Sequence, residues 1–270
     1  MALTLTALFA IALYAAGGVL LTQNIFSING SALYSRTRLL GIGFGAAVLH
    51  AIVLGATIPA ADGLHLGFFN ALSLIAWFGV ALLLLAALAR PVENLGLFVL
   101  PLAALALGFD LVAPSDQVVL RAAPIGLKAH VLISILAYAT LTIATIQAVL
   151  LAVQDRRLHR HRVTGLLGAL PPIETMESLL FQIIGVGFAL LTVSLATGFV
   201  FVENLFAQHL VHKTVLSITA WIVFGALLAG RVLRGWRGRT ALRWTVAGFV
   251  VLMLAYFGSK LVLELILNKP

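Results

Sequence analysis

The sequence predicts an all-α protein, a polytopic membrane helix bundle with about eight transmembrane helices. Of its 270 residues, 62% are hydrophobic and only 10% are charged, and the mean hydropathy is +1.12. Soluble domains average about 45–50% apolar and about 25% charged residues, so the excess apolar surface here requires lipid. Because spans and short loops use up the chain, we expect one membrane domain over residues 1–270 and no separate soluble catalytic domain.

Apolar runs of spanning length define the eight predicted helices. No Lys or Arg precedes the first run, as it would in a signal peptide, so we expect a retained first helix. The third run opens in the stretch from Gly63 to Gly67, and the fourth carries Asp110 near its end. The predicted ranges are 4–21, 39–58, 66–88, 95–113, 127–152, 178–201, 210–230 and 241–263.

Basic residues gather in alternate loops and predict the orientation. Twelve of the 17 Lys and Arg residues follow the first, third, fifth and seventh helices. The positive-inside rule places these loops in the cytoplasm and both termini outside. The net charge of +8 is then a topology signal. We expect these loops to contact anionic lipid headgroups rather than nucleic acid, because they are short and lack interleaved aromatic residues.

The longest predicted cytoplasmic connection covers residues 153–177. It begins with a run of arginines and histidines that includes His159 and His161, which we expect to be solvated. It ends in Pro171-Pro172 followed by Glu174 and Glu177, a pattern typical of a helix start because proline and acidic residues favour the first turn. A docking segment is the alternative interpretation.

Several classes of chemistry are excluded by what the sequence lacks. Without cysteine there is no thiol catalysis, Cys-ligated zinc, iron–sulfur cluster or disulfide. No zinc-protease motif, nucleophile elbow or phosphate loop is present. Gly41 and Gly45 lie in a predicted span, where their spacing predicts close helix packing rather than dinucleotide binding, and we expect the same of Gly185 and Gly187. The paired broken helices and inverted repeats of transporters are also missing.

Five histidines are placed in or beside the predicted spans. His50 lies near the middle of the second helix, where an imidazole needs either a hydrogen-bonding partner or a metal, and both alternatives stay open. The other four open the third, fifth and seventh helices on the predicted outer side, where an interfacial histidine is also tolerated without any function. They are His65, His130, His209 and His212.

Cations and aromatic residues lie on the same predicted side. Lys128 and Lys213 flank His130 and His212, and they suit either haem propionates or the snorkelling of long side chains to the interface. Arg121 and Lys260 share that side. The aromatic residues there predict either a porphyrin slot or an interfacial belt; they are Phe68, Phe69, Phe199, Phe201, Phe206 and Tyr256.

Several segments together resemble the cytochrome c assembly (CcsA) superfamily, and most closely its short YpjD branch, which is related to the HemX type. The resemblance covers nearly the whole chain. Its helical motifs here are Leu49-His50, Gly63-Leu64-His65, residues 70–77, His130 to Ala139, Gly185 to Thr192 and His212 to Trp221. Residues 171–181 and Gly258-Ser259-Lys260 are the parts most like the YpjD branch.

The resemblance implies a ligand set. It makes His50 the membrane-embedded histidine implicated in holding haem and His130 an outer axial ligand. We expect haem b as the cofactor, with iron ligands among His50, His130 and His212. The wider cofactor-binding set is His50, His65, His130, His212, Lys128 and Lys213.

Two departures from the family pattern bear on activity. Haem-ligating members have a tryptophan-rich loop ending in Trp-Asp, whereas the region here runs from Phe199 to Phe206 without tryptophan. Those members also have a second outer histidine after the last helix, whereas here Leu267 lies near the expected position. We therefore expect a haem-handling protein of a bacterial inner membrane that is not itself an enzyme or haem ligase. The alternative is a regulatory or assembly subunit that keeps the fold without haem and partners another membrane protein.

Overall fold

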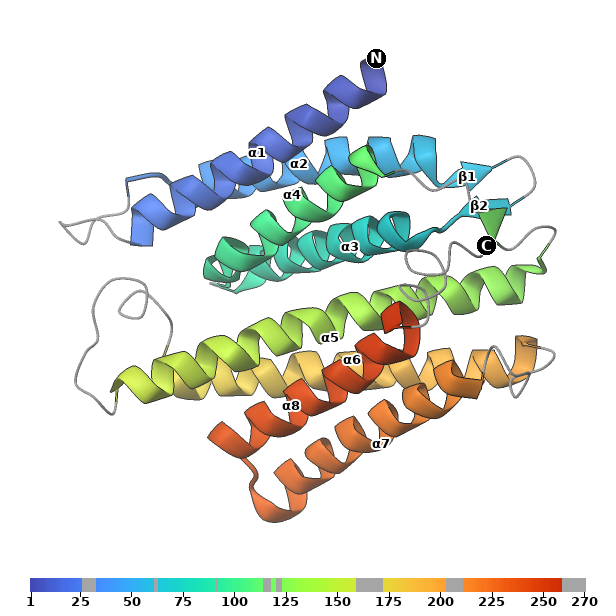
Figure 1. Cartoon of the computed structure of the whole chain (residues 1–270). Coiled ribbons are helices and arrows are strands. Elements are labelled where there is room, and N and C mark those ends of the chain that lie inside the picture. Colours follow the sequence, from blue (N-terminus) through green and yellow to red (C-terminus); the bar gives the residue numbers. More distant parts are fainter. Residues whose placement is uncertain are drawn as a thin grey trace. The chain divides into compact units, whose positions relative to one another are not determined.

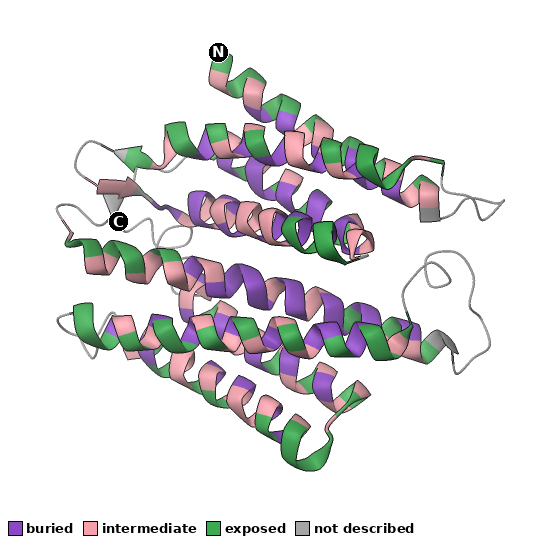
Figure 2. Ribbon diagram, turned by 180° about the vertical axis from the view of Figure 1, so that it is seen from behind, coloured by how far each residue is buried: buried purple, intermediate pink, exposed green. Residues whose placement is uncertain are grey.

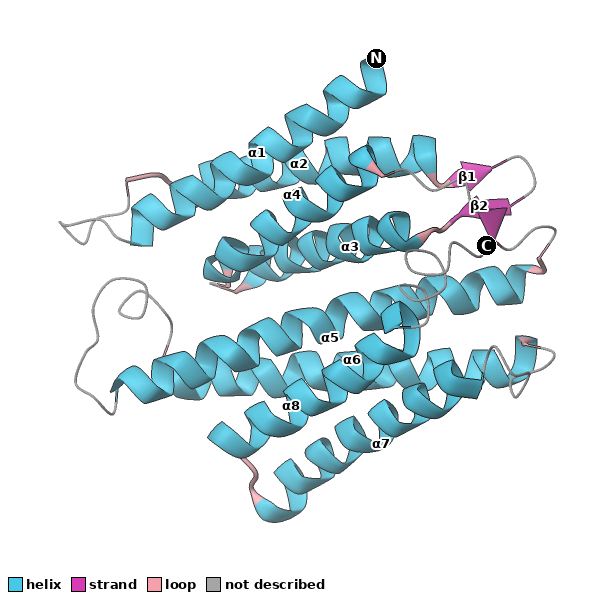
Figure 3. Cartoon of the chain, viewed as in Figure 1, coloured by secondary structure: helices cyan, strands magenta, loops and turns pink. Residues whose placement is uncertain are grey.

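The computed structural model consists almost entirely of helices, with three short strands (Figures 1 and 3). Its described residues include eight helices long and apolar enough to cross a membrane, which confirms the all-α polytopic class. The predicted helix ranges match these helices to within a few residues, except that α5 and α6 extend further toward the loop between them. The structure describes residues 1–25, 33–60, 63–90, 92–113, 118–119, 123–158, 172–202 and 211–258.

The chain divides into two compact units. Unit 1 comprises Met1–Val119 and Gln154–Pro172, and unit 2 comprises Leu120–Val153 and Ile173–Pro270. Each has its own buried interior, and each is described below by itself. The single membrane domain expected from the sequence stays a prediction.

Unit 1 is built from the first four helices. α1 packs against α2 and α4, and α3 packs against α2 and α4. Ser35 caps α2 by accepting a hydrogen bond from the backbone N–H of Arg38. The short 3-10 turn Glu93–Leu95 leads into α4. The helices are α1 (Ala2–Ile25), α2 (Arg36–Thr57), α3 (Phe68–Ala89) and α4 (Gly96–Val112).

Three short strands form a small antiparallel sheet at one end of unit 1 (Figure 3). Its order is β1 (Pro59–Ala60), β2 (Gly63–His65), β3 (Val118–Val119), with Leu64 paired to both Pro59 and Val119. The sequence analysis did not predict these strands, because two or three residues are too short to show an alternating pattern.

Unit 2 contains the last four helices. α6 follows Pro172 directly and has Glu174 in its first turn, which confirms the predicted helix start, five residues earlier than expected. A five-residue π-helix, Leu254–Gly258, extends α8. The helices are α5 (Ile125–Leu158), α6 (Ile173–Phe201), α7 (Val211–Arg234) and α8 (Gly238–Met253).

Close helix contacts use different glycines from those predicted. A Cβ added to Gly43 would lie 2.8 Å from Leu84, whereas one on Gly41 would meet nothing within 4 Å and one on Gly45 only a contact at 3.8 Å. The Gly41–Gly45 packing pair was therefore a wrong prediction, because both residues lie on the other side of α2 from this contact. In unit 2, Gly187 packs closely against α5 and Gly185 does not.

Many large apolar side chains are exposed on the helices of both units, and Figure 2 shows exposed residues along these helices in green. In unit 1, Phe9 is 61% exposed and Leu105 58%; in unit 2, Val186 and Ile222 are each 56% exposed. In water such a surface would be unfavourable, whereas a bilayer solvates it. The chain is a multi-pass membrane protein whose surroundings are the lipid bilayer.

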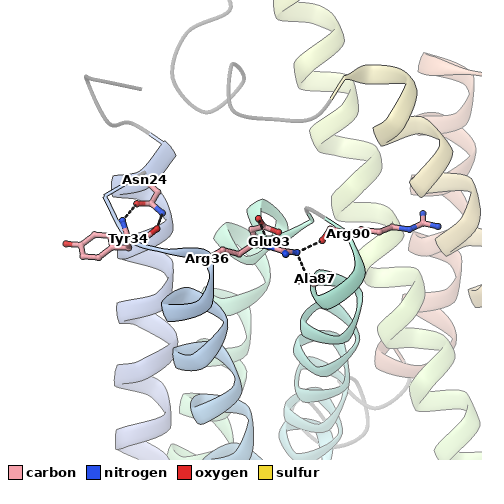
Figure 4. A network of polar contacts seen from close by, with 6 residues as sticks. All are labelled: Asn24, Tyr34, Arg36, Ala87, Arg90 and Glu93. Atoms are coloured by element: carbon pink, nitrogen blue, oxygen red, sulfur yellow. Dashed lines mark hydrogen bonds and ion pairs between the residues drawn. The ribbon is translucent and has the colours of Figure 1, made fainter. Parts of the chain in front are cut away.

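At the predicted cytoplasmic end of unit 1, the side chain of Arg36 links neighbouring helix ends (Figure 4). Its guanidinium donates to the carbonyl oxygens of Ala87 and Arg90 and forms an ion pair of 3.2 Å with Glu93. These contacts join the start of α2 to the end of α3 and the start of α4. Arg36 is therefore a structural link as well as a topology signal.

The corresponding end of unit 2 is organised around Glu177. Its carboxylate accepts a 2.5 Å contact from Arg231 and a 3.3 Å contact from Arg237, so α6 is tied to the α7–α8 turn. The guanidinium of Arg231 also lies 4.6 Å from the centre of the Phe181 ring. The sequence suggested that Glu177 favours a helix start; in the structure it also forms ion pairs with two arginines.

Candidate functional site

His50 is the centre of a buried polar network in unit 1. Its side chain is fully buried. Nδ1 lies 3.2 Å from the hydroxyl of Tyr14 on α1, and Nε2 lies 2.9 Å from the hydroxyl of Ser73 on α3. The imidazole therefore has a hydrogen-bonding partner at each nitrogen, which is what a polar group in this apolar interior requires.

A second buried polar contact joins α3 to α4. Asn70 on α3 donates from Nδ2 to Asp110 Oδ1 on α4 at 2.7 Å. Asp110 is only 7% exposed and Asn70 only 4%. The polar groups thus join all four helices of unit 1. The sequence signal for this cluster was a carboxylate inside a span, but its partners lie too far along the chain to be found by spacing.

This geometry bears on whether His50 fits haem. The sequence left metal ligation and structural hydrogen bonding open, and the structure shows hydrogen bonds at both nitrogens. Coordination of iron would require one of the two hydroxyls to be displaced from a fully buried position. The arrangement around His50 therefore does not fit an axial haem ligand as it stands.

His130 in unit 2 is arranged differently. It lies in the second turn of α5, since that helix begins at Ile125 rather than at the predicted residue 127. Nδ1 is 2.9 Å from the backbone carbonyl oxygen of Ser194 and 3.2 Å from the hydroxyl of Thr197, both on α6. A carbonyl oxygen only accepts, so Nδ1 carries the proton and donates it. Nε2 is then the unprotonated nitrogen of a neutral imidazole.

The backbone of α6 makes room for this ring. A Cβ added to Gly198 would lie 3.0 Å from Cε1 of His130, so the imidazole rests directly on a glycine. Next to it, the Ser134 and Ser194 hydroxyls lie 2.7 Å apart, and Ser134 donates to the carbonyl of His130. Sequence reasoning missed these α6 contacts because they are about 60 residues from His130 along the chain.

A histidine that binds a metal usually donates its other ring N–H to a carbonyl or carboxylate, which fixes the tautomer and the ring orientation. His130 has this arrangement, and the half-buried ring leaves Nε2 for a ligand. The residues around His130 therefore fit an axial haem ligand. Within the described residues, no three His, Asp or Glu side chains are grouped closely enough to hold a metal ion by themselves.

The other predicted residues of unit 2 lie at its predicted outer end. Figure 1 shows the start of α5, the end of α6 and the start of α7 at the same end of the unit. His212, the second residue of α7, is exposed, as is Lys128, and Lys213 is half-exposed. The pairing of His130 with His212 on one haem, and the contact of either lysine with propionates, stay predictions.

Several predicted residues lie outside the described part of the chain. The backbone of His65 lies in β2 of unit 1, but its side chain is not among those described. For the other predicted residues of this group, neither the backbone nor the side chain is described: Arg121, His159, His161, Phe206, His209, Lys260 and Leu267.

The described aromatic residues do not gather as one group in unit 2. Phe199 and Phe201 are 54% and 41% exposed on α6, which suits an interfacial belt. Tyr256 packs against Tyr138 with ring centres 5.8 Å apart. The hydroxyl of Tyr138 donates to the carbonyl of Leu252 at 2.7 Å and ties α5 to α8.

Comparison with known proteins gives a consistent result. The sequence model described as Cytochrome C assembly protein matches residues 42–267. Inner membrane protein YpjD of Escherichia coli K12 is 34% identical over 266 residues, which is 96% of this chain and 98% of that one. A 28.8 kDa protein of Azospirillum brasilense is 32% identical over 81% of this chain and 85% of its own. The cytochrome c biogenesis protein CcsA of Trichormus variabilis is 34% identical over 90 residues, 33% of this chain and 26% of its own. No solved structure matches.

Proposed function

The chain belongs to the cytochrome c assembly protein family, and we propose that it binds haem b at the predicted outer end of unit 2 without attaching it to another protein. The family relation supports a role linked to cytochrome c biogenesis. In this role haem is held, handed on or sensed in the membrane.

The observation that carries the proposal is the hydrogen bond from Nδ1 of His130 to the Ser194 carbonyl. It fixes the ring, selects the neutral tautomer and leaves Nε2 as the nitrogen that would bind iron. Haem would supply an iron centre for electron or ligand chemistry. Lys128 and Lys213, near the starts of α5 and α7, would offer positive charge to its propionates.

The absence of ligase activity is supported by the sequence between α6 and α7. Residues 199–206 carry three phenylalanines and no tryptophan. The chain also has no cysteine that could handle the thiols of an apocytochrome. A protein that presents haem for covalent attachment needs a surface for both partners, and these residues do not supply the one typical of the family.

A second candidate function is a regulatory or assembly subunit that keeps the fold without haem. The buried hydrogen bonds of His50 favour it, because the histidine that the family resemblance makes a ligand is occupied by Tyr14 and Ser73. Under either function we place the protein in a bacterial inner membrane, as the Escherichia coli relative's description suggests. Another membrane protein is then its partner.

An absorption spectrum separates the two functions. The protein is purified in detergent from haem-replete cells, and haem binding predicts a Soret band whose intensity follows the protein concentration. A colourless, folded protein that stays colourless after addition of haem would contradict the haem proposal and favour the regulatory subunit.

The absence of ligase activity is tested in cells that lack their own haem ligase. We expect no covalent haem staining of a reporter cytochrome c when this protein is expressed alone. Staining of the reporter would overturn that part of the proposal and leave haem binding intact.

A further inference from the structure

We propose that Asp110 is a proton-binding site near the predicted outer face of unit 1, where its protonated carboxyl group pairs with the Asn70 amide. The proposal does not depend on haem binding, since it concerns unit 1 alone.

The charges of unit 1 favour a protonated Asp110. Asp110 lies two residues before the end of α4 and is 7% exposed. On α1 to α3, the titratable or cationic side chains are Tyr14 on α1 and Arg36, Arg38 and His50 on α2, while α3 has none. The two arginines begin α2 at the opposite end of the unit, where Arg36 pairs with Glu93. The end of α5 adds Asp155 and Arg156 to unit 1.

His65 belongs to β2, and its side chain lies outside the described residues. Within the described part of unit 1, then, no Lys or Arg side chain neutralises Asp110. A buried carboxylate without a cation is strongly disfavoured and takes up a proton instead.

The Asn70 amide also favours a protonated Asp110. Asn70 donates from Nδ2 to Asp110 Oδ1 at 2.7 Å, which fixes the orientation of the amide. Its own Oδ1 is buried and has no hydrogen-bond partner among the described residues. A carboxylate cannot fill this need, because it only accepts. A carboxylic acid offers one donor and one acceptor, as does the amide, so one proton on Asp110 supplies the donor that Asn70 lacks.

Infrared difference spectroscopy of the protein in lipid nanodiscs tests the site. We expect the C=O stretching band of a protonated carboxylic acid at neutral pH, and its loss in Asp110→Asn. The band stays in the matched control Glu174→Gln, because Glu174 is exposed on α6. Asn70→Leu shifts it to higher wavenumber, since the C=O loses its amide donor. A folded wild type without a band at neutral pH, or a band unaffected by Asp110→Asn, would overturn the proposal.

Discussion

His50 in unit 1 and His130 in unit 2 were both expected to bind haem, and their surroundings differ in one decisive respect. His50 is fully buried between two hydroxyls, one at each nitrogen. His130 is half-buried, with its two described polar contacts on the same nitrogen. A histidine that is hydrogen-bonded at both nitrogens holds helices together. One that is hydrogen-bonded at a single nitrogen keeps the other nitrogen for a ligand.

The largest expected effect concerns the orientation that places His130 outside. A reporter active only in the cytoplasm should give full signal when fused within residues 153–177 and none when fused at Pro270. The reason is the division of the 17 Lys and Arg residues into 12 and 5. Signal at Pro270 would move His130 and His212 to the cytoplasmic side and overturn the orientation of the site.

The next effect concerns stability in unit 1. His50→Leu leaves the buried hydroxyls of Tyr14 and Ser73 without the imidazole, so we expect a loss of ~2–4 kcal/mol in the free energy of unfolding. Thermal or denaturant unfolding in detergent measures it. The matched control His212→Ala removes an exposed side chain and should cost less than about 0.5 kcal/mol. Equal effects of the two variants would contradict a structural role for His50.

A smaller effect is expected where α6 supports His130. The Cβ of Gly198→Ala would lie 3.0 Å from the imidazole, so the ring must shift by a few tenths of an ångström. We expect haem affinity to fall by about tenfold, which is the smallest loss typical when a residue that orients a metal ligand is changed. Titration of the purified protein with haem measures the affinity. Gly185→Ala is the control, because its Cβ meets nothing within 4 Å; equal affinities of the two variants would count against the contact.

The smallest effect is expected for Thr197→Val. It removes the hydroxyl 3.2 Å from Nδ1 of His130 but leaves the Ser194 carbonyl, which holds the proton at 2.9 Å. Haem affinity should fall only a few-fold, by about 1 kcal/mol or less. A loss as large as that of Gly198→Ala would mean that Thr197, and not the carbonyl, orients the ring.

The apolar runs were sufficient to predict the helices because a span must be apolar along its length. Which side of each helix faces a neighbour was harder to predict: the sequence favoured Gly41 and Gly45, and the contact uses Gly43. A residue one or two places away along a helix points in another direction, and apolar residues surround a buried span on all sides.

The candidate site was predicted only in part for a related reason. His130 was found through the family resemblance and the lysine beside it, but Ser194, Thr197 and Gly198 are ordinary residues of an apolar helix. Their role comes from the packing of α6 on α5, which brings together positions about 60 residues apart. The same holds for Ser73 and Tyr14 beside His50.

The central claim is that Nε2 of His130 binds haem iron, and His130→Gly with added imidazole tests it most directly. The account predicts that the folded variant loses the Soret band and that free imidazole, which fits the space left by the side chain, restores it. His159→Ala, in the predicted cytoplasmic loop, should keep the full spectrum without imidazole. A His130→Gly protein with the spectrum and haem content of the wild type would contradict the account.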